Sequence, residues 1–280
     1  PGHDGLHIKV LQKYWEFLRL PFLKAINSMI SNKKLSARMR YTKIKLIKKN
    51  GNVDLTKISS LRPISVVSST YKIFSGVIAN RLKKVIHKVV YKSQKAYSNI
   101  RCIQEGLIYT NEIIAKAINT NTPLSIMSLD FSSAFDSIGH SYIIETLKFF
   151  NFGEYFIDLV DTCFNERYGH ISTEDGITNN FKIGIGCLQG DRPSGDFFKI
   201  GLNPLALFLT ISQTISLPRE LPFNLPPNSP PPDNNTIFAD DGNIFTHLNI
   251  TCLLFCYNIL VKFGNLSGLS INAKKTKLCV

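Results

Sequence analysis

Two adjacent carboxylates, Asp240 and Asp241, lie inside the otherwise apolar, strand-like segment TIFADDGNIF, residues 236–245. Neighbouring anions repel each other and resist burial, so a fold that keeps them there must compensate their charge. The flanking residues predict two short strands joined by an Asp241-Gly242-Asn243 turn. At the tip of such a hairpin both side chains can converge on one point, and the natural compensator is a divalent cation. The alternative is a solvated Asp-Asp-Gly turn without a role.

The charge of the chain is distributed unevenly. Of the net charge of +13, residues 1–100 carry +18, with 21 Lys and Arg against 3 Asp and Glu, and the rest of the chain carries −5. An excess this large indicates a polyanion partner, with nucleic acid favoured over membrane phosphates. Within this basic half, residues 69–90 are predicted as an amphipathic helix whose cations, Lys83 and Lys84 among them, lie against a phosphate backbone.

Length and composition exclude several classes of protein. A chain of 280 residues, 44% of them hydrophobic, can form one large or two small packed domains and is not disordered. Its six cysteines have neither CxxC nor zinc-like spacing, which predicts reduced thiols in an intracellular protein. The longest apolar stretch, residues 202–211, is too short to cross a bilayer. Because the chain begins at Pro1 and ends in an apolar run, it is expected to be an excerpt from a longer polypeptide.

Hydrophobic periodicity predicts an α+β organisation. Helices are expected over residues 8–30 with a break at Pro21, 69–90, 103–119, 141–150, 154–165, 193–211 and 251–266. Strands are expected over residues 41–50, 61–67 and 124–131, with a hairpin over 170–185. Asp130 ends the third of these strands. Residues 217–235 hold seven of the thirteen prolines and are predicted as an exposed, extended insertion.

Four segments follow one another in an order that resembles palm motifs A, B, C and D of reverse transcriptases: SLDFSSAFDSI, GCLQGDRPSG, IFADDGNIF and SGLSINAKKT. LRPISVVSSTYKIFSGVIANRL and the opening PGHDGL resemble the fingers segments of the non-LTR (LINE-type) retrotransposon branch. The similarity covers essentially the whole chain. It implies a right-hand polymerase of α+β class, with fingers over residues 1–122 and a palm, whose antiparallel sheet packs against helices, over 123–280. The thumb is then absent from this chain.

The resemblance implies an RNA-directed DNA polymerase, part of a larger retrotransposon polyprotein, that adds deoxynucleotides to a primer 3′-hydroxyl by a two-metal mechanism. Hard cations take oxygen ligands, so two Mg²⁺, with Mn²⁺ as a substitute, would be held by Asp130, Asp240, Asp241 and the main-chain carbonyl of Phe131. Asp136 competes for the role of Asp130 but falls in the turn or helix beyond the strand.

The partners that the resemblance implies are an RNA template, a DNA primer and deoxynucleoside triphosphates. It also implies thumb and endonuclease regions of the same polypeptide. No membrane is expected, and the location would be intracellular, in the cytoplasm and nucleus.

Several residues match the family's nucleotide-binding positions. Phe135, five residues after Asp130, matches the steric gate that excludes a 2′-hydroxyl, with a core aromatic as the alternative. Lys275 matches a lysine near the leaving phosphates, with a solvated turn lysine as the alternative. The remaining matches are Arg62 as the residue that grips the triphosphate, Gln189 and Gly190 of motif B beside the incoming nucleotide, and Arg101 as a weaker nucleic-acid contact.

The chain departs from the family pattern in three places. Phe238 replaces the usual Tyr of motif C, Arg192 and Gly195 replace residues of the usual Pro-Leu-Ser-Pro, and the insertion lengthens the connection between motifs B and C. A catalytically inactive, polymerase-derived nucleic-acid-binding scaffold is one alternative function, and a group II intron maturase is another. Three intact carboxylates argue against the scaffold, because a scaffold has no reason to retain such costly side chains together.

Overall fold

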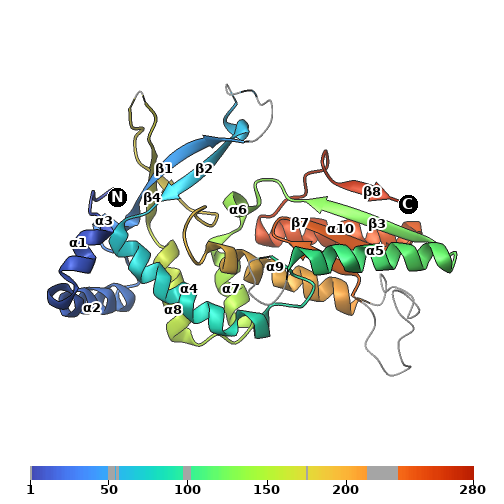
Figure 1. Ribbon diagram of the computed structural model, residues 1–280, viewed down its shortest axis with the longest axis horizontal. Coiled ribbons are helices and arrows are strands. Elements are labelled where there is room, and N and C mark those ends of the chain that lie inside the picture. The colour runs from blue at the N-terminus through green and yellow to red at the C-terminus, as the bar shows by residue number, and fades with distance from the viewer. Residues whose placement is uncertain (1, 50–53, 55–56, 97–101, 175, 213–232) are drawn as a thin grey trace. The chain divides into compact units, whose positions relative to one another are not determined.

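The computed structural model of the chain describes residues 2–49, 54, 57–96, 102–174, 176–212 and 233–280 (Figure 1). Two compact units interleave along the sequence. The first unit comprises residues 1–84 and 139–194, and the second comprises residues 85–138 and 195–280. These are units of packing, whereas fingers and palm are functional subdomains. The expected boundary between residues 122 and 123 therefore stays a prediction.

The first unit is built on a four-stranded mixed sheet in the order β2-β1-β4-β5. Its strands are β1 (Tyr41–Lys48), β2 (Leu61–Val66), β4 (Arg167–Ile171) and β5 (Phe181–Ile183). β1 pairs antiparallel with β2 and parallel with β4, and β4 and β5 form the predicted hairpin. The helices are α1 (Ile8–Lys13), α2 (Trp15–Ser31), α3 (Ala37–Arg40), a 3-10 turn at Ile58–Ser60, α7 (His140–Phe149), α8 (Glu154–Phe164) and most of α4 (Ser69–Val89).

The second unit contains a fully antiparallel sheet in the order β6-β7-β3-β8. Its strands are β3 (Leu124–Asp130), β6 (Asn235–Phe238), β7 (Asp241–His247) and β8 (Lys277–Cys279). Its helices are α5 (Ile103–Asn119), α6 (Ala134–Ser137), α9 (Ser194–Ile211) and α10 (Ile250–Ser267). The predicted α+β class, with an antiparallel sheet packed against helices, is confirmed.

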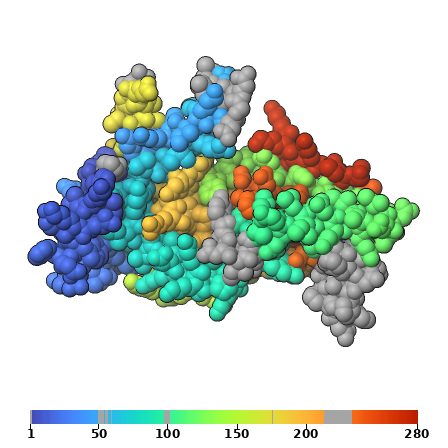
Figure 2. All heavy atoms as spheres, in the orientation of Figure 1, coloured from blue at the N-terminus to red at the C-terminus, as the bar shows by residue number. Residues whose placement is uncertain are grey.

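Helices cover both faces of this antiparallel sheet. Successive strand residues point to opposite sides, and residues on each side contact a helix. On one face Phe245, which is fully buried, packs with Ile113 and Tyr109 of α5. On the other face Phe131 contacts Phe263 of α10, with ring centroids 6.3 Å apart. α5 lies on the surface in Figure 2. Leu107, Ile108 and Ile118 of this helix are exposed. The sheet is therefore the centre of a three-layer arrangement within this unit.

The first predicted helix breaks at a different residue from the one expected. Its interruption is at Tyr14, and α2 continues through Pro21. Proline removes one backbone hydrogen bond from a helix interior, here the bond to the carbonyl of Phe17. Because Pro21 is exposed, water can satisfy that carbonyl, and the helix does not have to end there.

Two further boundaries differ from the predicted ones. Ser68, rather than Ser69, caps α4, because its hydroxyl accepts from the backbone N–H of Tyr71 at 3.2 Å. The hydroxyl of Ser69 instead donates to the carbonyl of Leu6 at 2.8 Å. Asn235 belongs to β6 and is fully buried, so the exposed insertion ends before it. Residues 217–232 of the predicted insertion lie outside the described residues.

By length and composition, α10 is the one described helix that could cross a membrane, with a mean hydropathy of 1.4 over its 18 residues. The sequence had drawn attention to residues 202–211 instead. Cys252, Cys256, Leu260 and Phe263 form a buried stripe at helical spacing along α10. A core helix that packs one face on a sheet has the same composition, so α10 alone is weak evidence for a membrane.

Phe245→Ala is expected to lower the free energy of unfolding by about 3–5 kcal/mol, because the substitution leaves a cavity between the sheet and α5. Urea denaturation followed by circular dichroism measures this loss. The control is Phe17→Ala on α2, where the side chain is 81% exposed, and there the change should stay within about 0.5 kcal/mol. Equal losses for the two variants would show that Phe245 is not part of the core.

Candidate active site

The two adjacent carboxylates lie at the tip of the predicted hairpin, but the turn is two residues earlier than expected. Ala239 and Asp240 form it, with Ala239 in the left-handed region at φ 55°. Asp241 already belongs to β7, opposite Phe238. The cause is the third strand: all seven residues of β7 pair with β3, so the ladder includes Asp241-Gly242-Asn243, which alone would favour a turn.

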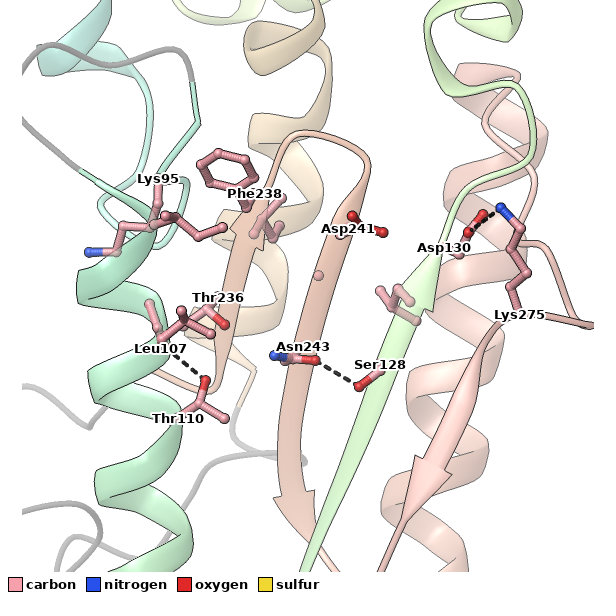
Figure 3. Close-up of a pocket in the computed structure, with 15 residues that line it drawn as sticks. Lys95, Leu107, Thr110, Ser128, Asp130, Thr236, Phe238, Asp241, Asn243 and Lys275 are labelled. Atoms are coloured by element: carbon pink, nitrogen blue, oxygen red, sulfur yellow. Dashed lines mark hydrogen bonds and ion pairs between the residues drawn. The ribbon is translucent and has the colours of Figure 1, made fainter. Parts of the chain in front are cut away.

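Asp241 lies directly opposite Asp130 in the antiparallel pair of β7 and β3. Directly opposite residues project from the same face of a sheet, with their Cβ atoms about 5 Å apart. Figure 3 shows the two side chains at the same end of neighbouring strands. The structure thus brings together the predicted strand carboxylate and one of the two hairpin carboxylates. Asp240 is exposed in the turn beside them.

Lys275 compensates part of this negative charge. Its Nζ lies 2.9 Å from Oδ2 of Asp130, and Figure 3 shows the two side chains pointing toward each other. The segment before β8 is held there by the backbone, since the N–H of Asn272 donates to the carbonyl of Asp130 at 2.8 Å. The hydrogen bond to Asp130 raises the pKa of Lys275, and the charge of Asp130 adds to the effect. Sequence reasoning selected both residues but did not predict that they pair.

One ammonium does not neutralise the cluster. Partial burial raises the pKa of Asp241, and the negative charges of Asp240 and Asp130 raise it further, whereas Lys275 lowers it. The repulsion expected from the sequence is therefore present among these three carboxylates. A divalent cation would relieve it more effectively than a single lysine, because it brings two charges to the same point.

A hollow of about 450 Å³ lies beside the carboxylates. Alternate residues of three strands line it from one face of the sheet: Ser128, Asp130, Thr236, Phe238, Asp241 and Asn243. α5 contributes another part of the lining, and Lys95 and Lys275 bring positive charge to it. In its wall the hydroxyl of Ser128 donates to Oδ1 of Asn243 at 2.8 Å (Figure 3). The volume falls within the range of ligand clefts, about 300–1,000 Å³.

The carboxylates fit a metal pair only in part. Asp130 and Asp241 offer hard oxygen ligands on one face, which suits Mg²⁺ or Mn²⁺. Among the described residues, however, no group of three His, Cys, Asp or Glu side chains is arranged to hold a metal ion. Asp130 is paired with Lys275, and Asp240 is in the exposed turn. The predicted ligand set of Asp130, Phe131, Asp240 and Asp241 therefore stays a prediction.

The two aromatic residues named from motif A have different surroundings. Phe131 is buried on the opposite side of the strand from Asp130, where it contacts α10. Phe135 on α6 is half-buried and stacks on Phe198 of α9, with ring centroids 4.5 Å apart and an angle of 16° between the rings. Phe135 thus touches the core with one face, and the structure is compatible with both of its predicted roles.

The predicted nucleotide-binding residues Arg62, Gln189 and Gly190 belong to the first unit, whereas the carboxylates belong to the second. Arg62 is part of β2, and Gln189 and Gly190 lie in a loop that contacts the same strand. The N–H of Ser65 donates to the carbonyl of Gln189 at 2.8 Å. Gly190, the next residue in the loop, has a φ of 103°. Arg62 is exposed on β2, three residues before Ser65.

Two of the three residues predicted to contact nucleic acid lie in the described part of the chain. Lys83 and Lys84 are exposed on α4, as the amphipathic pattern requires. Arg101 lies outside the described residues.

Asp191, which follows Gln189 and Gly190, was not selected from the sequence, although Tyr71 and Ser75 both donate to its carboxylate. Its only sequence signal was its place in the QGD triplet.

Comparison with known families matches residues 47–280 to the family described as reverse transcriptase (RNA-dependent DNA polymerase). An uncharacterized 149 kDa protein of transposon TX1 from Xenopus laevis is 29% identical over 209 residues, which cover 75% of this chain. The retrovirus-related Pol polyprotein of a type-1 retrotransposable element R2 from Popillia japonica is 25% identical over 99% of this chain. The chain spans 16% of the first relative and 36% of the second.

Telomerases are among the solved structures with a similar fold. The chain resembles telomerase from Candida albicans, in complex with a fragment of telomeric RNA, with a TM-score of 0.61 and 14% identity. That likeness covers 96% of this chain and 46% of the telomerase chain. A truncated apo telomerase from Candida tropicalis has a TM-score of 0.54 at 15% identity, covering 91% of this chain and 54% of the other. The right-hand polymerase fold is thereby confirmed.

Gly190→Ala is expected to lower the free energy of unfolding by about 1–3 kcal/mol, because a left-handed φ strains any residue with a Cβ. The added carbon would also lie 3.2 Å from the carbonyl oxygen of Ser65. Thermal unfolding measures the change. Gly184→Ala in the same unit is the control, since nothing lies within 4 Å of its Cβ position. Similar losses for both variants would contradict a special requirement for glycine at residue 190.

Proposed function

Because the chain belongs to the reverse transcriptase (RNA-dependent DNA polymerase) family, we propose that it adds deoxynucleotides to a primer 3′-hydroxyl on an RNA template. The observation that carries this proposal is the pairing of Asp130 with Asp241 at the end of two adjacent strands, beside a hollow of ligand size. Carboxylates in this arrangement attract the cations that nucleotidyl transfer requires.

We assign the metal-holding role to the carboxylates of Asp130, Asp240 and Asp241 and to the carbonyl of Phe131. Two divalent ions bound there would make the primer hydroxyl nucleophilic and neutralise the triphosphate as pyrophosphate leaves. Lys275 holds one carboxylate of the set through the 2.9 Å contact with Asp130. Lys275 also lines the hollow, so its ammonium is in a place to contact a phosphate bound there.

The remaining assignments concern the substrates. Arg62 offers an exposed guanidinium that can grip a triphosphate by bidentate hydrogen bonds. Gln189 and Gly190 contact the incoming nucleotide, and Phe135 excludes a 2′-hydroxyl. Exposed Lys83 and Lys84, with Arg101, contact the backbone of the template–primer. These roles come from the matching motifs, and the exposure and local geometry of the described residues among them support the proposal.

The partners are proposed on the same basis. We infer that an RNA template, a DNA primer and deoxynucleoside triphosphates bind within the cell, and that thumb and endonuclease regions of a longer retrotransposon polyprotein assist them. The support is that the chain covers only part of its longer retrotransposon relatives. Coverage of this kind is what a polymerase core within a larger polypeptide produces.

Asp240→Asn is expected to abolish primer extension and to leave binding of a template–primer duplex nearly unchanged, because it removes one metal ligand with little change in shape. Single-encounter extension with Mg²⁺ and fluorescence anisotropy of the labelled duplex measure the two effects. Asp136→Asn, which changes an exposed carboxylate on α6, is the matched control. Undiminished extension by Asp240→Asn would refute the metal assignment. Equal loss of extension in both variants would show that the effect is not specific to Asp240.

Phe135→Val is expected to raise incorporation of ribonucleotides relative to deoxynucleotides by about tenfold or more, because the ring no longer occupies the space of the 2′-hydroxyl. Competitive incorporation by the variant and the wild type measures the ratio. Phe150→Val provides a matched, half-buried phenylalanine whose loss should leave the ratio unchanged. An active Phe135→Val variant with an unchanged ratio would assign Phe135 to the core beside Phe198.

A further inference from the structure

Asp191 is held by three hydrogen-bond donors. The hydroxyl of Tyr71 donates to its Oδ2 at 2.8 Å, and the hydroxyl of Ser75 donates to its Oδ1 at 2.7 Å. The backbone N–H of Arg192 donates to the same Oδ1 at 2.9 Å. Tyr71 and Ser75 are one helical turn apart on α4, so both hydroxyls reach the carboxylate from one face of the helix. The loop that contains Gln189 and Gly190 is thereby tied to α4.

A buried arginine supports this contact from the other side of Tyr71. The guanidinium of Arg167 lies 4.2 Å from the centre of the Tyr71 ring, and both residues are only 2% exposed. Nη2 of Arg167 donates to the hydroxyl of Thr42 on β1 at 2.9 Å. Its Nε and Nη1 have no hydrogen-bond partner among the described residues. Burial raises the pKa of Asp191, whereas the hydrogen bonds from Ser75 and Tyr71 and the charge of Arg167 lower it.

The same loop is fixed to β2 on its other side. The carbonyl of Gln189 accepts from the N–H of Ser65 at 2.8 Å. A Cβ at Gly190 would lie 3.2 Å from the carbonyl oxygen of Ser65, so the two backbones are in close contact. Arg62, the residue predicted to bind the triphosphate, is also part of β2. The same strand therefore supports both Arg62 and the loop. Residues 189–191 therefore lie between β2 and α4, with contacts to both.

We propose that Asp191 is a positioning residue for nucleotide binding, which holds Gln189 and Gly190 in register with Arg62. This inference rests on the function proposed above. Asp191 acts through the loop and does not touch the nucleotide. The reason to assign it a role beyond packing is that an ionised network is costly to bury, whereas an apolar side chain could fill the same space at lower cost. The carboxylate instead fixes the one loop that carries two nucleotide-binding residues.

The test uses Tyr71→Phe, which removes one donor to Asp191 and keeps the ring against Arg167. We expect the KM for deoxynucleotide to rise about three- to tenfold, as for loss of one hydrogen bond to a buried carboxylate, with kcat changed less than about twofold. The affinity for the template–primer should not change. Hydrogen exchange at the amide of Ser65 should become faster, because the loop that accepts its hydrogen bond is loosened.

Tyr109→Phe is the matched control. It removes a hydroxyl that donates to the carbonyl of Asp233, in the other unit, and should change neither the KM nor the exchange at Ser65. Ser75→Ala removes the second donor to Asp191 and should act in the same direction as Tyr71→Phe, which also covers the case that Tyr71→Phe does not fold.

The measurements distinguish a failure of the positioning role of Asp191 from a failure of the proposed polymerase function. An unchanged nucleotide KM in both Tyr71→Phe and Ser75→Ala, a loss confined to kcat, or an equal effect of Tyr109→Phe would overturn the positioning role. A wild-type chain that extends no primer would overturn the proposed function. In that case hydrogen exchange at Ser65 still shows whether Asp191 holds the loop, and unchanged exchange in Tyr71→Phe would reject the tether as well.

Discussion

The antiparallel pairing of β3 with β7 is the interaction on which the candidate site depends. Its register places Asp130 opposite Asp241, and the same register buries Phe245 against α5. Because the side-chain period of a strand is two, a slip of β7 by one residue would turn Asp241 and Phe245 to the opposite face of the sheet and separate Asp241 from Asp130. The hydrophobic core and the charged end of the sheet are thus specified by one set of backbone hydrogen bonds. The packing of the core thus offsets the repulsion among the carboxylates of the site.

Charge is balanced differently in the two units. In the second unit an exposed lysine on a turn pairs with Asp130, so the compensating cation can be exchanged. In the first unit Arg167 is buried, stacked on Tyr71 and bonded to β1, so its charge cannot leave. A replaceable partner suits carboxylates that must accept other cations during a reaction. A fixed partner suits a carboxylate whose task is to keep a loop in place.

Elements with a strong local signal were predictable from the sequence. α5 has the predicted bounds, and Asp130 ends its strand as expected, because periodicity and a flanking proline define both. The turn at Ala239 and Asp240 was not predictable, since it depends on pairing with β3, more than 100 residues earlier in the chain. The same reason applies to the pair of Lys275 and Asp130 and to the two hydroxyl groups of α4 that donate to Asp191. In each case the partners are far apart in sequence, and no local pattern records their contact.

The interleaving of the two units has a consequence for how the chain forms during synthesis. The first unit takes one of the two sheet partners of β1, the strand β4, from residues 167–171, after the chain has already supplied α5 and β3 to the second unit. A ribosome that has released only the first 138 residues has therefore completed neither unit, and the strand that ends in Asp130 still lacks its neighbour β7. Long-range pairings of this kind close slowly, and they leave strand edges unpaired in the meantime. Until β4 and β7 follow, β1 and β3 each keep an unpaired edge, and these edges are the segments of the nascent chain that a chaperone would protect.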